Sequence, residues 1–280
     1  ATNGRDWAAA APDGARLHYT YYARPQVSEL GALPAGAPLS GPPLGGISVT
    51  VSGVGFAAVA DAVGGRANPH NALPGHELCI TSNEAFHLES LPKAIVIEGG
   101  GYIAVEFANI FHGLGVDTTL VYRGKEILGR FDMDMRRGLH EAMEAKGIRI
   151  ICQRVIKQVE RAANGGLRAH LSEGEVLEAG QVMLAIGRVP NTDMLGLDRA
   201  GVETDHQGAV IVDDYQRTSV PNIWAVGDVT NKVQLTPVAI HEAMCVVETA
   251  FKGNPVRPDR DTIATAVFSQ PEIGTVGLSE

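Results

Sequence analysis

Three consecutive glycines, residues 99–101, stand between the apolar residues 94–97 and an amphipathic segment. With Ala104 they complete the spacing G-x-G-x-x-A. In a strand, turn and helix of this kind the first glycine permits a tight turn, the second lets the backbone approach a pyrophosphate, and the alanine lets the helix pack close to the strand. The start of the helix adds free N–H groups and partial positive charge. The pattern predicts a dinucleotide-binding site.

A cation follows the next predicted strand. Residues 118–122 are β-branched and aromatic, which predicts a strand, and Arg123 and Lys125 come directly after it. NAD enzymes normally place a carboxylate here for the ribose 2′-hydroxyl, whereas a guanidinium pairs with a 2′-phosphate. We therefore expect the nucleotide to be NADPH, bound through Arg123 and preferred over NADH.

Glu98 departs from the motif, because small apolar residues usually precede the first glycine. Its charge would either repel the pyrophosphate or disturb the end of the strand, and the sequence leaves both open. In the first case Glu98→Ala would tighten NADPH binding, since two ionised groups a few ångströms apart repel at a cost of about 1 to 4 kcal/mol.

Bulk properties narrow the class of protein. The 280 residues, 45% of them hydrophobic, are enough for one large or two medium domains with their own cores. A net charge of −9 argues against nucleic acid or an anionic membrane as partner. No apolar run has the length of a spanning helix, and no leader-like segment opens the sequence. We expect a cytoplasmic protein.

The three cysteines, Cys79, Cys152 and Cys245, are widely scattered. An odd number without C-x-x-C spacing suits a reducing compartment and excludes a disulfide framework or a cysteine metal site. We expect small buried side chains rather than metal ligands.

Residues 1–62 differ from the rest of the chain. Alanine, glycine and proline make up about half of them, no lysine occurs before Lys93, and only residues 47–51 alternate as a strand should. Such a segment buries little apolar surface. We expect it to be poorly ordered, or an unrelated or out-of-frame translation.

From residue 63 onward, segments with the apolar periodicity of helices or strands are separated regularly by glycine or proline residues. Residues 164–166 predict a hairpin turn. Helices are expected from near Ser82, at 102–114, at 132–146 and from near Pro237, and strands at 94–97, 118–122, 149–152, 154–161, 168–172 and 182–186. This order predicts an α/β sheet interrupted by a small antiparallel layer.

A second candidate site lies at residues 218–228, which read as a buried strand ending in Gly227 and Asp228. At the carboxyl end of a strand in an open α/β sheet, an aspartate is placed to accept hydrogen bonds from a polyol. The alternative is an ordinary aspartate cap for the helix near Pro237.

Five sequence blocks in order resemble the flavin-dependent pyridine nucleotide–disulfide oxidoreductases, and among these the glutathione reductases. They are residues 82–86, 185–192, 218–228, 234–240 and 267–278. The resemblance runs from about Gly64 to the last residue. It implies a Rossmann-like FAD/NAD(P)-binding fold with small antiparallel layers, the cofactors FAD and NADPH, and a homodimer.

The resemblance also implies roles for single residues. Tyr102 would cover the nicotinamide pocket until NADPH enters, and Glu106 would support the flavin side. Arg130 is expected to join Arg123 at the 2′-phosphate, although the family's second arginine usually precedes Gly-Phe-Asp and here the order is Gly-Arg-Phe-Asp. Asp228 would hold the ribityl chain of the flavin and Thr236 would lie near its ring. The expected cofactor-binding residues are Gly99, Gly100, Gly101, Tyr102, Ile103, Glu106, Arg123, Arg130, Gly187, Asp228 and Thr236.

The implied activity is the NADPH-dependent reduction of glutathione disulfide. The family's first flavin motif, redox cysteine pair, flavin-side lysine and acid–base histidine have no counterparts in this sequence. We therefore expect the chain alone to be inactive. Alternatives are a non-catalytic NADP(H)-binding module and a relative of the mercuric, trypanothione or dihydrolipoamide type.

The same resemblance divides the chain into four parts. Residues 63–180 would form the NADPH-binding domain, residues 181–260 the C-terminal part of the FAD-binding domain, and residues 261–280 the start of the dimerisation domain. Residues 1–62 would precede them, with the N-terminal FAD half and most of the dimerisation domain absent.

Overall fold

The computed structural model describes residues 8–10, 16–18, 59–61 and 63–277. They belong to two compact units, one formed by the chain up to Arg66 with Val189–Arg260, the other by Ala67–Arg188 with Asp261–Glu280. The strand predicted at 47–51, and the poor order expected for 1–62 apart from three short strands, lie outside the described residues.

The helical elements include two 3₁₀ turns, η1 and η2. They are η1 (His76–Leu78), α1 (Ser82–Ala85), α2 (Tyr102–Gly113), α3 (Met133–Lys146), α4 (Leu197–Ala200), η2 (Gly227–Thr230) and α5 (Thr236–Phe251). Within the described part of the chain, none of them combines the length and the apolar character that a membrane crossing needs.

The strands are mostly three to six residues long. They are β1 (Ala8–Ala10), β2 (Arg16–His18), β3 (Val59–Asp61), β4 (Gly65–Ala67), β5 (Ala94–Glu98), β6 (Asp117–Tyr122), β7 (Arg149–Cys152), β8 (Ile156–Arg161), β9 (Leu167–Leu171), β10 (Val176–Ala179), β11 (Gln181–Leu184), β12 (Arg188–Pro190), β13 (Ile223–Ala225), β14 (Thr265–Val267) and β15 (Ile273–Thr275).

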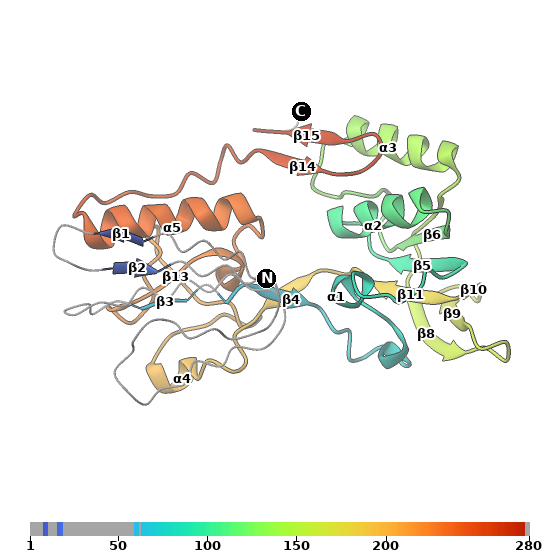
Figure 1. Ribbon diagram of the computed structural model, residues 1–280, viewed down its shortest axis with the longest axis horizontal. Helices are drawn as coiled ribbons and strands as arrows, with labels where there is room; N and C mark the ends of the chain where they lie inside the picture. Colours follow the sequence, from blue (N-terminus) through green and yellow to red (C-terminus); the bar gives the residue numbers. More distant parts are fainter. Residues whose placement is uncertain (1–7, 11–15, 19–58, 62, 278–280) are drawn as a thin grey trace. The chain divides into compact units, whose positions relative to one another are not determined.

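A four-stranded parallel sheet, in the order β11-β5-β6-β7, is the centre of the unit that contains the glycine motif. Helices α2 and α3 lie on one side of it and the antiparallel strands β8 to β10 on the other (Figure 1). Because both faces are covered, β5 is a continuous apolar run rather than an alternating one. The predicted α/β fold with a small antiparallel layer is confirmed.

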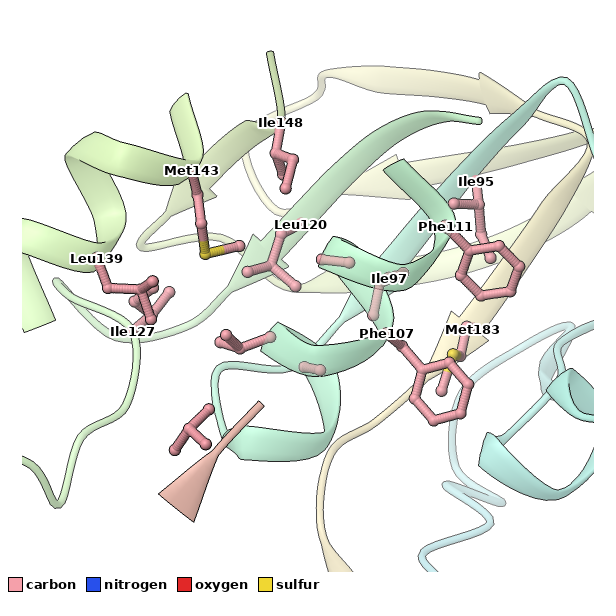
Figure 2. Close-up of a cluster of buried hydrophobic side chains, with 14 of the residues drawn as sticks. Ile95, Ile97, Phe107, Phe111, Leu120, Ile127, Leu139, Met143, Ile148 and Met183 are labelled. Carbon is pink, nitrogen blue, oxygen red and sulfur yellow. The ribbon is translucent and has the colours of Figure 1, made fainter. Parts of the chain in front are cut away.

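Strand β5 divides its side chains between two cores. Ile95 and Ile97 pack with Phe107 of α2 and Leu120 of β6 on the helical side, as Figure 2 shows. Val96 faces the antiparallel sheet. Successive residues of a strand point to opposite faces, so each side anchors the strand. Burial of each such side chain contributes about 1.5 to 3 kcal/mol.

Both long helices of this unit lie within one residue of their predicted bounds, 102–114 and 132–146. Helix α2 stops at Gly113, and Gly115 has a positive φ of 84°. Asp132 caps α3 by accepting hydrogen bonds from the amides of Asp134 and Met135, and Gly147 ends it at φ 107°. Glycine is favoured there because this backbone conformation strains other residues.

The antiparallel sheet has the order β10-β9-β8 and corrects the sequence reading in two places. Strand β10 lies outside the predicted strands, because four residues are too short a run to stand out in the sequence and the strand is defined by its pairing with β9. Strand β8 begins at Ile156 rather than Arg154, because the amide of Arg154 donates to the carbonyl of Tyr122 at the end of β6. The hairpin turn at 164–166 is confirmed by Gly165, with φ 85°.

In the other unit β13 pairs in parallel with β3, and α5 begins at Thr236, beside the predicted Pro237. The strand predicted over 218–228 is shorter than expected. The hydroxyl of Thr218 donates toward the carbonyls of Val220 and Ile223, which makes a turn, so the strand comprises only Ile223–Ala225. Trp224 packs on α5 through Val246.

Candidate dinucleotide-binding site

Gly99, directly after β5, lies against Ala185, which follows β11, and against Ala104 in the first turn of α2. Its φ is 150°, and a Cβ placed there would lie 2.3 Å from the carbonyl oxygen of Ala185 and 2.9 Å from the Cβ of Ala104. No side chain fits. Its amide donates to Val121 of β6 at 2.9 Å. The predicted roles of Gly99 and Ala104 in a tight strand-to-helix junction therefore agree with the packing.

Gly100 has a different reason to lack a side chain. A Cβ there would lie 2.3 Å from the ring of Tyr122, and one at Gly124 would lie 2.5 Å from the same ring. The phenol oxygen of Tyr122 is also 3.4 Å from a Cβ built at Gly129. The ring at the end of β6 thus occupies the space that these three glycines leave.

Gly101 faces open space, because nothing lies within 4 Å of a Cβ built on it. It is the N-cap of α2 with φ −85° and ψ 178°, and no side chain caps the helix. No acidic residue occurs in the first turn. A helix N-terminus with accessible amides and no nearby side chain suits the pyrophosphate of a dinucleotide.

The loop from Arg123 to Arg130 carries the predicted phosphate contacts. Arg123, Lys125 and Arg130 are exposed, and none of them forms an ion pair with another residue in the described ranges. The amide of Leu128 in the same loop donates to the carbonyl of Gly100 at 2.6 Å. The structure therefore brings the cationic loop against the glycine turn, although the two are more than twenty residues apart.

The structure decides between the two alternatives for Glu98. Its side chain is only 5% exposed, and Oε1 accepts a hydrogen bond of 2.9 Å from the amide of Ile156 at the start of β8. Oε2 is buried without a partner. Burial raises the pKa of this carboxyl, while the Ile156 amide and Lys157 oppose the shift. The carboxylate belongs to the junction of β5 with β8, so the expectation that Glu98→Ala would relieve repulsion at the pyrophosphate loses its basis.

The other predicted residues of α2 lie on its first two turns. Tyr102 and Ile103 are half-buried against the helical core. Glu106 accepts a hydrogen bond of 2.9 Å from the amide of Phe268, and burial raises the pKa of its carboxyl. One turn further along, Asn109 accepts from the amide of Gln270 at 3.2 Å. The polar face of α2 therefore holds the segment around β14.

The remaining predicted contacts are spread over both units. Gly187 follows β11, has φ 117° and also has nothing within 4 Å of a Cβ. Asp228 and Thr236 lie in the other unit, in η2 and at the exposed start of α5.

The turn that carries Asp228 is fixed by a buried ion pair. Glu242, 1% exposed, accepts from the amide of Gly227 at 2.8 Å, and Arg260 donates to the same carboxylate at 3.0 Å. Arg260 also donates to the buried Gln216 at 2.9 Å. A buried charge is stable only when paired in this manner.

All three cysteines are free thiols. Burial, with a contribution from Glu98 and Glu77, raises the pKa of Cys79 to about 12. Burial also raises the pKa of Cys152 and of Cys245. Because the thiolate is the nucleophile in disulfide exchange, none of the three is activated for it.

Comparison with known proteins places this geometry in a family. The profile described as "Pyridine nucleotide-disulphide oxidoreductase" matches residues 53–243, well over half of the chain. The chain belongs to this family. The match begins before the sequence resemblance that was apparent from Gly64, and it includes strand β3.

Curated relatives in the family include two kinds of reductase. Trypanothione reductase of Leishmania donovani is 50% identical over 212 residues, which are 74% of this chain and 43% of the relative. Glutathione reductase of Nostoc sp. is 46% identical over 231 residues, 78% of this chain and 50% of the relative. The chain thus spans about half the length of the relatives it matches.

Solved structures of the family resemble the fold. The HOCl-induced flavoprotein disulfide reductase RclA of Escherichia coli has a TM-score of 0.75 at 28% identity, over 80% of this chain and 52% of that one. Together with the family match, this supports the Rossmann-like dinucleotide-binding fold predicted from the sequence.

Sequence reasoning missed the residues that hold the cationic loop. Arg136, in the first turns of α3, donates from Nε to the carbonyl of Ile127 at 2.7 Å and from a terminal nitrogen to that of Glu126 at 2.8 Å. His140, one turn along, forms a close pair with the carboxylate of Glu126. A signal was present, because the start of a helix favours carboxylates and an arginine there needs another partner.

Glu98→Gln is expected to stabilise the folded chain more at about pH 8 than at about pH 5. Because burial raises the folded-state pKa of Glu98, ionisation costs stability as the pH rises above the ordinary value of 4.5. Glutamine cannot ionise, and its amide oxygen can still accept from Ile156. Thermal unfolding at the two pH values checks this, with Glu89→Gln as the exposed control. An equal difference between variant and parent at both pH values would contradict it.

Proposed function

We propose that this chain carries the NADPH site and part of the FAD site of a flavoprotein disulfide reductase that acts on glutathione disulfide. One observation carries the NADPH assignment: the open N-terminus of α2 at Gly101 lies next to a loop with three exposed cations and no carboxylate partner among the described residues. The site thus offers backbone amides to a pyrophosphate and guanidinium groups to a 2′-phosphate.

In this proposal each residue of the NADPH site has one task. The turn at Gly99–Gly101 receives the pyrophosphate, and Arg123 with Arg130 binds the 2′-phosphate. Tyr102 covers the nicotinamide pocket before NADPH enters, and Ile103 and Glu106 line it. Bound NADPH supplies a hydride for the flavin.

On the flavin side, Asp228 accepts hydrogen bonds from the ribityl chain, Thr236 lies near the ring and Gly187 leaves room for the cofactor. The support for this part is local geometry. Glu242 holds the amide of Gly227 next to Asp228, so the aspartate sits on a turn with a fixed backbone. A carboxylate on a rigid turn at the end of a strand suits a polyol ligand.

Trypanothione disulfide is the second candidate substrate. The 50% identity to the trypanothione reductase of Leishmania donovani favours it, whereas 46% and 43% identities to the glutathione reductases of Nostoc sp. and Burkholderia cepacia favour glutathione disulfide. Joining this chain to the part of one of these glutathione reductases that it does not match, and comparing kcat/KM for both disulfides, separates the two candidates.

A non-catalytic NADP(H)-binding module is the alternative from another class. The raised pKa values of all three thiols support this view of the isolated chain. Flavin absorbance of the purified protein separates the two, because a colourless protein that binds NADPH would be the module. The cytoplasmic location, the homodimer and the four-part domain division also remain proposals.

Gly101→Ala is expected to weaken NADPH binding with little loss of stability, within about 1 kcal/mol. The added methyl group clashes with nothing in the protein but projects into the space assigned to the pyrophosphate. Gly100→Ala is the contrasting variant, because its methyl meets the Tyr122 ring and should destabilise the chain by about 1 to 3 kcal/mol. Thermal unfolding without nucleotide measures the stability of both variants, and titration with NADPH measures their affinity. If Gly101→Ala bound NADPH as tightly as the wild-type chain, the pyrophosphate would not bind at Gly101.

Arg123→Ala is expected to remove most of the preference for NADPH over NADH. Charge-assisted hydrogen bonds to a 2′-phosphate are worth about 1.5 to 3 kcal/mol, or roughly ten- to a hundred-fold in affinity. Isothermal titration of the intact chain with both nucleotides measures the ratio. Equal affinities in the wild-type chain would show that Arg123 has another role.

The chain supplied with NADPH and FAD is expected to reduce no glutathione disulfide. Its three cysteines are buried or half-buried thiols with raised pKa values, and none is paired with another. NADPH absorbance measures turnover. Steady turnover that survives serine replacement of all three cysteines would refute the dithiol mechanism, and its loss in one variant would identify a redox cysteine.

A further inference from the structure

The cationic loop at residues 123–130 has no regular secondary structure, yet part of it is rigidly packed. Ile127 and Leu128 are 0% and 1% exposed, whereas Arg123 and Arg130 at its two ends are exposed. The buried part therefore fixes the path of the backbone between the two exposed arginines.

The contacts that hold this path come from one face of α3. Arg136 and His140 are four residues apart, so their side chains lie on the same side of the helix. Arg136 uses two guanidinium nitrogens for two consecutive carbonyls, those of Glu126 and Ile127, at 2.8 and 2.7 Å. His140 pairs with the side chain of Glu126. The loop is thus gripped through its backbone and one side chain.

The grip extends to the glycine turn. Leu128, which follows the two carbonyls held by Arg136, donates its amide to the carbonyl of Gly100 at 2.6 Å. On the other side, the amide of Gln153 donates to the carbonyl of Gly124 at 2.9 Å. Continuous contacts therefore connect α3, through the cationic loop, to the glycine turn.

From these contacts we infer that Arg136 is a positioning residue for nucleotide selectivity, which holds Arg123 and Arg130 at the distance from the glycine turn that a 2′-phosphate requires. The inference rests on the proposed NADPH site. Arg136 itself is occupied by the two carbonyls, so it acts through the loop and not by touching the nucleotide. NADH lacks the 2′-phosphate, so its affinity does not depend on where the loop holds Arg123 and Arg130.

The test uses the full chain, titrated with NADPH and with NADH, as Arg136→Ala and as Arg137→Ala. Arg137 is the matched control, because it is the adjacent exposed arginine and its loss changes the net charge equally. Arg136→Ala should weaken NADPH binding by roughly tenfold and NADH binding by less than about twofold, since only a charge-assisted contact is misplaced. Arg137→Ala should leave the ratio unchanged.

Three outcomes overturn the inference in distinguishable ways. If the wild-type chain binds both nucleotides equally, the proposed NADPH site fails with it. If the wild-type chain prefers NADPH and Arg136→Ala keeps that preference, only the positioning role fails. If Arg137→Ala lowered the ratio of NADPH affinity to NADH affinity by the same factor, the effect would come from the change in net charge. Circular dichroism checks that each variant is folded. If Arg136→Ala is unfolded, Arg136→Met, which keeps an apolar stem, is titrated with both nucleotides instead and judged by the same criteria.

Discussion

The close approach of three backbones at Gly99 is the constraint on which this site depends. The carbonyl of Ala185, directly after β11, and the side chain of Ala104 in α2 leave no volume there for even a methyl group. Because α2 begins so close to the strand ends, its first amides open at the carboxyl edge of the parallel sheet. Any residue larger than glycine would push the helix away and turn those amides from their direction.

Two cores secure this junction from opposite sides. Ile95 and Ile97 tie β5 to the helices, and Val96 ties it to the antiparallel sheet. Glu98 continues the second set, and its hydrogen bond to Ile156 replaces the apolar contact that another residue would make there. The glycine turn therefore follows a strand that is held on both faces, as a preorganised binding site requires.

Local signals sufficed where a residue's role depends on its own backbone, as with Gly99 and Gly147. They failed where the partner is distant in sequence. Ile156, which explains Glu98, is 58 positions away, and the short strand β10 is defined by its pairing with β9. The place of Arg136 near a helix start indicates that it needs a partner, but not that its partners are the backbone carbonyls of Glu126 and Ile127. The family resemblance supplied roles for Tyr102, Asp228 and Thr236 that packing alone does not reveal.

The Tyr122 ring has an evolutionary consequence. The ring contacts Gly100, Gly124 and Gly129. A side chain at Gly100 or Gly124 would collide with the ring unless Tyr122 were replaced by a smaller residue. The effects of substitutions at these positions are therefore not additive. A larger residue at Gly100 or Gly124 is tolerated only after Tyr122 has been replaced by a smaller residue. Engineering of the cofactor choice of this loop therefore has to change Tyr122 and its neighbouring glycines together.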